Sequence, residues 1–271
     1  CYRIKMTLES KINSVIALYS NGQIEKAIEG VEALIKDYPN EALLHNISGA
    51  FYQAIGQLNE SVKSFEKAVT INSDYAEAHY NLGVTLQQLG QLETAMKSYE
   101  QAIAIKHAYP NAHNNLGAIL QELGQLDAAV KSYEKTLAIK PDFADAHYNL
   151  GVVFQELGQL DAAVKSYEKT LSIKPDYPQT HNNLGIIHLE RGQIDDAVKQ
   201  YEKAVAIKLD YAEAYHNLSY IKKYTANDPQ ITQMQSLLST SNLSQSDRTY
   251  LCFALANVNE NLGNQDEFFE F

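Results

Sequence analysis

The chain of 271 residues contains no tryptophan, only six prolines and two cysteines, and its net charge is −11. Cys1 and Cys252 provide no disulfide framework and belong to no CxxC pair, so a reducing compartment is permitted. Nucleic acids and anionic membranes attract basic surfaces, and the acidic balance argues against both partners. No run approaches the roughly 18 apolar residues of a membrane span. We expect a cytoplasmic protein.

Glycine is the residue that shows how the chain is organised, because it recurs every 34 residues in two phases. The first phase comprises Gly49, Gly83, Gly117, Gly151 and Gly185. The second comprises Gly22, Gly56, Gly90, Gly124, Gly158 and Gly192. A repeated unit of this length cannot bury its apolar face alone and buries it against the next copy. The period therefore predicts an all-α solenoid of stacked helix pairs.

One repeat, residues 76–109, shows the pattern of a helix pair. Apolar residues at helical spacing predict a first helix that ends at Gly90 and a second helix from Leu92 to Ile103. Two boundaries, 74–77 and 210–213, have the form of capping boxes with Asp in the cap position. Gly83 lies inside the first helix, where glycine costs about 1 kcal/mol relative to alanine. We expect it to admit the small residue Ala95 of the paired helix.

The pattern resembles the tetratricopeptide repeat in six places of the 34-residue unit. These are Leu-Gly at places 7 and 8, Gly at 15, Ala at 20, Tyr or Phe at 24 and Pro at 32. The resemblance divides the chain into a leader, 1–7, and an array, 8–226. Its units are 8–41, 42–75, 76–109, 110–143, 144–177 and 178–211, followed by the first helix of a seventh from 212. It implies a right-handed superhelix with a concave groove.

The region 227–271 departs from the period and is predicted to form an irregular helical end. We expect one helix from Gln230 to Leu238 and another that starts after a Ser244 cap and runs to Asn261. Three phenylalanines at the end of the sequence, the last of them Phe271, indicate a second helix that is cut short. We therefore expect the natural protein to continue. This tail resembles the connector of bacterial tetratricopeptide-containing sulfotransferases. The resemblance implies an alternative function, the substrate-recruiting arm of a sulfotransferase or glycosyltransferase.

An asparagine series holds place 6 of the first helices and is the strongest candidate for a binding site. It comprises Asn81, Asn115, Asn149, Asn183 and Asn217. An amide both donates and accepts, which suits the backbone of an extended peptide. The series resembles the asparagine ladder of the O-linked N-acetylglucosamine transferase repeats, which implies that it lines the groove. The alternative interpretation is that these residues only help adjacent helices to pack.

Neighbouring places on the same helical face would set the specificity of the groove. The predicted binding residues there are Tyr80, Gln87, Asn114, Gln121, Tyr148, Gln155 and Asn182. This wall is polar, partly aromatic and neutral to acidic, with Glu77 and Asp145 among its members. It favours a neutral or mildly basic protein segment as partner. Self-association of the similar units is a further possibility.

Five histidines at place 4 share the period: His45, His79, His113, His147 and His181. Packed helices lie roughly 8–10 Å apart, whereas zinc donors lie about 2 Å from the ion. The five are therefore predicted to be packing elements and not metal ligands. No catalytic constellation is readable, so we predict a non-catalytic scaffold without catalytic residues, metal or cofactor.

Overall fold

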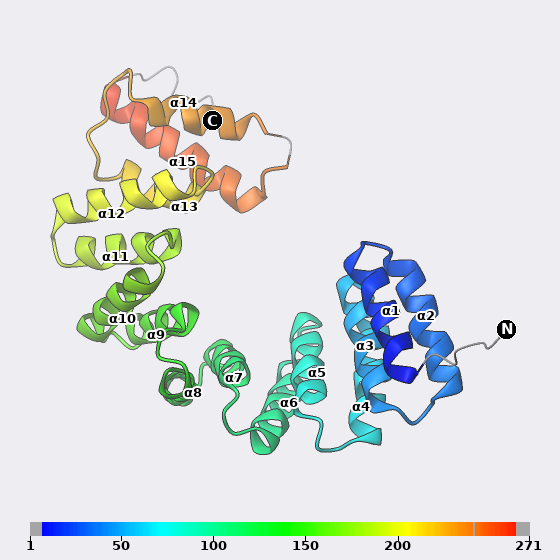
Figure 1. Cartoon of the computed structure of the whole chain (residues 1–271). Helices are drawn as coiled ribbons and strands as arrows, with labels where there is room; N and C mark the ends of the chain where they lie inside the picture. The colour runs from blue at the N-terminus through cyan, green and yellow to red at the C-terminus, as the bar shows by residue number, and fades with distance from the viewer. Residues whose placement is uncertain (1–6, 241, 264–271) are drawn as a thin grey trace. The chain divides into compact units, whose positions relative to one another are not determined.

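The computed structural model describes residues 7–240 and 242–263, and these residues form fifteen α-helices and no strand (Figure 1). The predicted all-α architecture is confirmed. The chain divides into two compact units, Cys1–Pro141 and Asp142–Phe271. None of the described helices has the length and apolar character needed to cross a bilayer.

The first compact unit stacks four helix pairs. They are α1 (Leu8–Ser20) with α2 (Ile24–Asp37), α3 (Ala42–Ala54) with α4 (Leu58–Ile71), α5 (Ala76–Gln88) with α6 (Leu92–Ile105), and α7 (Pro110–Glu122) with α8 (Leu126–Ile139). The second helix of each of the first three pairs also contacts the first helix of the next. The first helices α3, α5 and α7 contact one another in turn. Each pair thus buries its apolar face against its neighbours.

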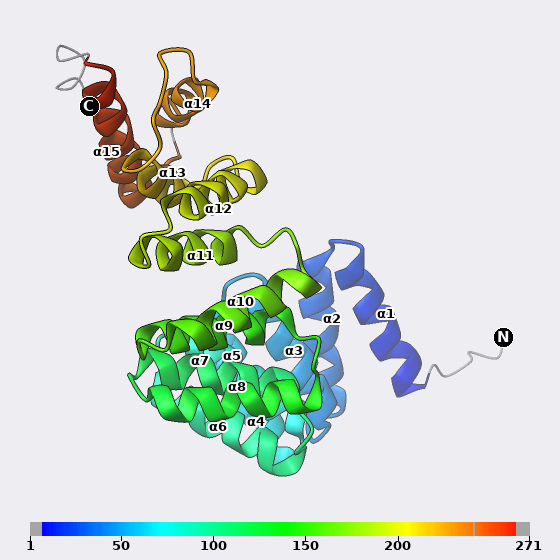
Figure 2. The ribbon, with the colours of Figure 1, turned by 90° about the vertical axis from the view of Figure 1, so that its left-hand side faces the viewer.

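The second compact unit repeats this arrangement and then changes it. It contains α9 (Ala144–Glu156), α10 (Leu160–Ile173), α11 (Pro178–Glu190), α12 (Ile194–Ile207), α13 (Ala212–Ser219), α14 (Pro229–Leu238) and α15 (Gln245–Leu262). Both α13 and α14 pack against α15, which lies beside α13 in Figures 1 and 2. Tyr215, Met234, Leu251 and Leu255 form a buried core there. The irregular end therefore closes over the last repeat.

Glycine at place 15 follows the first helix of each of the six complete repeats and adopts positive φ, as the sequence predicts. Gly90, with φ of +71°, follows α5, and the backbone N–H of Gln91 donates to the carbonyl of Leu86 at 2.9 Å. Glycine adopts this left-handed conformation without the steric penalty that a Cβ atom brings. The turn is short, so the two helices of a unit run antiparallel.

Glycine at place 8 has a different neighbour from the one predicted. A Cβ atom on Gly83 would lie 2.7 Å from the ring of Tyr99, the aromatic residue at place 24. The same conflict recurs at Gly49, Gly117, Gly151 and Gly185. The glycine makes room for an aromatic ring of the paired helix and not for the small residue at place 20. The aromatic ring fills more of the space between the two helices than an alanine side chain does. Its packing therefore requires glycine at place 8.

The predicted capping boxes are wrong, whereas the predicted Ser244 cap is confirmed. At α5 and α13 the N-cap residues are Tyr75 and Tyr211, and neither helix has a side-chain cap hydrogen bond. At α15 the Ser244 side chain accepts from a backbone N–H group, as expected, and Asp228 does the same at α14. The predicted second helix of the tail and its three phenylalanines lie outside the described residues.

Candidate functional site

The predicted binding residues all lie on first helices of the array. Tyr80, Asn81 and Gln87 are on α5, Asn114, Asn115 and Gln121 on α7, Tyr148, Asn149 and Gln155 on α9, Asn182 and Asn183 on α11, and Asn217 on α13. Asn182 is buried, with 1% of its surface exposed, and bonds to Glu213 and Asn217. The surface that the other residues form within each compact unit is called the first-helix face below. The place 6 asparagines are half-buried, so each is positioned by contacts inside the protein and still reaches the surface.

A hydrogen-bond chain links consecutive repeats through the place 24 tyrosine. Asn115 Nδ2 donates to the Tyr99 hydroxyl at 3.3 Å, and that hydroxyl donates to Gln87 Oε1 at 2.9 Å. In the second compact unit, Asn183 Nδ2 donates to Tyr167 at 3.0 Å, and Tyr167 donates to Gln155 at 3.0 Å. Each chain runs from one repeat into the preceding one. We call it the amide–tyrosine chain.

Where a member of this chain is missing, the place 6 asparagine turns to another amide. Phe65 lacks the hydroxyl, and Asn81 Nδ2 donates to Asn46 Oδ1 at 3.1 Å. Leu189 replaces the glutamine, and Asn217 Nδ2 donates to Asn182 Oδ1, also at 3.1 Å. The donor half of these asparagines is therefore used inside the protein in both arrangements.

The carbonyl oxygens, Oδ1, of these amides differ from the Nδ2 groups in their hydrogen bonding. Within the described part of the chain, no donor reaches Oδ1 of Asn81, Asn183 or Asn217. A half-buried carbonyl oxygen of this kind can accept from a backbone N–H of an extended peptide. The hydrogen bonds thus show that the Nδ2 side of these amides is used in packing. Oδ1 of Asn115 is also used inside the protein, since it accepts from Asn114 Nδ2 at 3.4 Å. The binding interpretation stays a prediction.

Place 5 alternates between asparagine and tyrosine, which the sequence analysis overlooked. The residues are Asn46, Tyr80, Asn114, Tyr148 and Asn182, so the face repeats every 68 residues and not every 34. Place 2 alternates with it, since Glu77 and Asp145 accompany the tyrosines and Asn111 and Gln179 accompany Asn114 and Asn182. Comparing alternate repeats instead of adjacent ones would have found this signal.

The place 5 tyrosines pack against the aromatic residue that closes their own repeat. Ring centroids lie 5.0 Å apart for Tyr80 and Tyr109 and 4.9 Å apart for Tyr148 and Tyr177. The Tyr177 hydroxyl donates to Asp145 Oδ1 at 3.2 Å. An exposed carboxylate therefore lies next to a tyrosine pair on α9, and Glu77 holds the equivalent position on α5.

Electrostatics keep these tyrosines protonated. Burial raises the pKa of Tyr109 to about 12, and the charges of the Tyr80 and Glu77 side chains add to that rise. Burial raises the pKa of Tyr99, and the hydrogen bond from Asn115 opposes that rise. Desolvation disfavours the phenolate, so the hydroxyls remain donors. The amide–tyrosine chain depends on this, because Tyr99 donates to Gln87.

The place 4 histidines have a more specific role than the packing predicted for them. His79 Nε2 bonds to the carbonyl oxygen of Ser73 at 3.0 Å, and His113 Nε2 to that of His107 at 3.2 Å. His45 and His181 bond likewise to carbonyls six residues earlier. They fix the loop that enters each first helix. Among the described residues, no group of three or more His, Cys, Asp or Glu could hold a metal ion.

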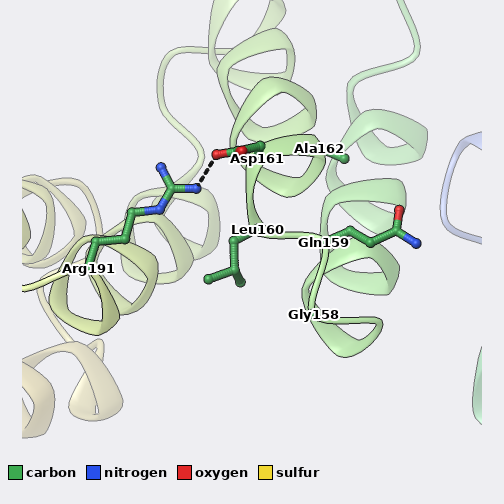
Figure 3. A pocket seen from close by; sticks show the side chains of 6 residues that line it. All are labelled: Gly158, Gln159, Leu160, Asp161, Ala162 and Arg191. Carbon is green, nitrogen blue, oxygen red and sulfur yellow. Dashed lines mark hydrogen bonds and ion pairs between the residues drawn. The ribbon is translucent and has the colours of Figure 1, made fainter.

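Two surface pockets lie in different settings. One of about 490 Å³ is on the first-helix face, lined by Ile16, Leu43, Asn46 and Glu77 among others. Another of about 550 Å³ lies at the turn between α9 and α10, where Arg191 reaches Asp161 at 2.6 Å (Figure 3). The first continues the predicted groove to α1. The second lies at a helix-connecting turn, outside the predicted binding residues.

The sequence and its helix pairs match the models of a known family. A TPR repeat model matches residues 49–90, 85–124 and 119–158, and a tetratricopeptide repeat model matches residues 142–210. The chain belongs to the tetratricopeptide repeat family. No curated protein matches the chain.

Solved structures with the same fold include proteins of several kinds. A crystal structure of MamA is 30% identical, with a TM-score of 0.57, and the match covers 64% of this chain and 97% of MamA. YrrB, described as a TPR protein with an unusual peptide-binding site, is 19% identical over 70% of this chain and 97% of its own, with a TM-score of 0.59. The Cut9-Hcn1 structure is 18% identical over 93% of this chain and 50% of its own, with a TM-score of 0.65. The last two matches concern the fold alone.

Proposed function

We propose that this protein is a non-catalytic scaffold that holds an extended protein segment on its first-helix face. The observation that carries the proposal is the orientation of the place 6 amides. The Nδ2 groups of Asn81, Asn183 and Asn217 donate within the protein, while their Oδ1 atoms receive no donor from the described residues. Oδ1 of Asn115, in contrast, accepts from Asn114 Nδ2 at 3.4 Å. Within the second compact unit, the fixed acceptors of Asn183 and Asn217, 34 residues apart, suit the backbone N–H groups of an extended chain.

Membership of the tetratricopeptide repeat family supports this proposal, and so does the peptide-binding site for which YrrB is named. The resemblances to the glycosyltransferase ladder and to the sulfotransferase connector rest on the sequence alone. The alternative function is that of a recruiting arm of a larger enzyme, and in that role the chain would use the same face. The proposal therefore concerns how a segment is held, and it is the same for either role.

The test uses a fluorescein-labelled peptide of twelve residues in which Ser and Gln alternate, and binding is measured by fluorescence anisotropy. The double variant Asn81→Ala/Asn183→Ala changes one acceptor in each compact unit. We expect each compact unit to bind the peptide roughly fivefold more weakly, because each unit loses one acceptor and a hydrogen bond contributes about 1 kcal/mol. A peptide N-methylated at every second residue should bind the unaltered protein with a similar loss.

The matched control changes two exposed amides outside the first helices, Gln101→Ala/Gln159→Ala, which should bind as the unaltered protein does. Thermal unfolding of each variant shows whether it is folded. Equal affinity of the two peptides, together with equal affinity of a folded Asn81→Ala/Asn183→Ala variant, would contradict the proposal.

A further inference from the structure

The alternation of place 5 divides the four first helices α5, α7, α9 and α11 into two kinds. The amide kind, α7 and α11, carries asparagine at place 5 and an uncharged amide at place 2. The tyrosine kind, α5 and α9, carries tyrosine at place 5 and a carboxylate at place 2. If all first helices only held a peptide backbone, one kind would suffice. The second kind offers a different chemistry at every second repeat.

Each tyrosine-kind helix places an exposed carboxylate beside a pair of half-buried aromatic rings. On α9, Asp145 accepts from Tyr177, whose ring centroid lies 4.9 Å from that of Tyr148. On α5, Glu77 lies near Tyr109, whose ring centroid is 5.0 Å from that of Tyr80. We call Glu77 with Tyr80 and Tyr109, and Asp145 with Tyr148 and Tyr177, the two acid–tyrosine subsites.

The charges around the subsites are mostly negative. Neither Glu77 nor Asp145 takes part in an ion pair within the described residues. Burial raises the pKa of Tyr148, and the nearby carboxylate of Glu213 adds to that rise. The basic groups nearby are Lys106 and Lys174, and their Nζ atoms lie 4.7 and 4.9 Å from the ring centroids of Tyr109 and Tyr177. These tyrosine rings therefore already accommodate a cation, while the carboxylates have no cationic partner.

We propose that each acid–tyrosine subsite binds a basic side chain, Lys or Arg, of a segment held on the first-helix face of its own compact unit. A carboxylate provides a charge-assisted hydrogen bond to such a side chain. Tyrosine rings and hydroxyls cover its alkyl stem. This inference rests on the proposed function: the asparagine acceptors hold the backbone and the subsites select positive charge at alternate repeats. The net charge of −11 suits a basic partner.

The experiment compares three fluorescein-labelled peptides of twelve residues, in which Ser alternates with Lys, Gln or Glu. The unaltered protein at 0.15 M salt should bind the Ser–Lys peptide at least tenfold more tightly than the Ser–Gln peptide and the Ser–Glu peptide most weakly. The isosteric double variant Glu77→Gln/Asp145→Asn should lose most of the preference for Lys.

A matched control separates the subsites from the general negative charge. Glu100 and Glu168 are exposed, lie on second helices of the same two repeats and are also 68 residues apart. The variant Glu100→Gln/Glu168→Gln removes the same two charges and should keep at least half of the affinity for the Ser–Lys peptide. The Debye length of about 8 Å at this ionic strength screens distant charges.

The outcomes distinguish this inference from the proposed function. An equal loss of Ser–Lys binding in both double variants would overturn the subsites and leave diffuse attraction. Equal affinity for the Ser–Lys and Ser–Gln peptides, with loss in Asn81→Ala/Asn183→Ala, would also overturn the subsites but keep the proposed function. If the asparagine variant binds every peptide as the unaltered protein does, the proposed function itself fails. Thermal unfolding again verifies that each variant is folded.

Discussion

The helices inside the array and those at its ends begin in different ways. From α2 to α13 no helix has a side-chain cap hydrogen bond, although Asp and Gln are plentiful near their first turns. In contrast, α1, α14 and α15 are capped by Thr7, Asp228 and Ser244. The regular helices of the array thus begin without side-chain caps, whereas the first helix and the two helices of the irregular end have them, and a cap supplies an acceptor for an otherwise unpaired backbone N–H group.

Removing an aromatic ring inside the array should give the largest effect. Tyr99 is fully buried, so Tyr99→Ala should lower the free energy of unfolding by about 3–5 kcal/mol, as measured by urea denaturation. Tyr99→Phe keeps the ring and removes only the hydroxyl of the amide–tyrosine chain, which should cost about 0.5–1.5 kcal/mol. A loss for Tyr99→Ala no larger than for Tyr99→Phe would refute ring packing as the main stabiliser.

The glycine partner of this ring provides a further check on the same comparison. Gly83→Ala should destabilise the unaltered protein because the new Cβ atom would lie 2.7 Å from Tyr99. In the Tyr99→Ala background the ring is gone, and the better helix propensity of alanine should make the same change neutral or stabilising. Additive effects of the two substitutions would contradict the contact.

Cap substitutions test the difference between array and ends directly. Thr7→Ala and Ser244→Ala should each cost about 1 kcal/mol, because each removes an acceptor of a backbone N–H group. Asp74→Ala and Asp210→Ala, at the positions that only the sequence identifies as caps, should change the free energy of unfolding by less than about 0.5 kcal/mol. Hydrogen exchange at the first turns of the four helices would measure this contrast, and equal effects would remove it.

The smallest effect is expected at the turn between α9 and α10. The Arg191–Asp161 ion pair is short, but the Asp161 side chain is 92% exposed. A double-mutant cycle with Arg191→Ala and Asp161→Ala should give a coupling of about 0.2–1 kcal/mol. High salt should reduce it through screening. A coupling that persists in 1 M NaCl would indicate a structural role beyond a surface ion pair.

Much of the fold could be predicted from the sequence because the information is local and repeated. Gly90 ends α5 as expected, and α14 and α15 lie within one residue of their predicted ends. The side chain that contacts Gly83 could not be predicted, because Ala95 and Tyr99 both lie on the facing helix and only the packing of the two helices determines which of them makes the contact. The error at Asp74 has the same origin: a capping pattern does not show whether tertiary contacts already hold the helix.

The candidate site shows the same limit. The asparagine series was recognisable from its spacing, but the orientation of each amide depends on Tyr99, Tyr167 or an amide of the preceding repeat. The binding role of these residues remains a prediction. The alternation of tyrosine and asparagine at place 5 was present in the sequence, yet its meaning requires the ring contacts of Tyr80 and Tyr148.

The 34-residue period by itself determined that the chain forms stacked helix pairs, since a unit with one apolar face must bury it against the next copy. Tertiary structure alone decided which atoms of the repeated side chains are used inside the protein and which face outward. The reason is physical: helical periodicity fixes the face on which a residue lies, whereas hydrogen bonds and ring contacts form between helices that are distant in sequence. Asn183, whose Nδ2 is held by Tyr167, illustrates both levels.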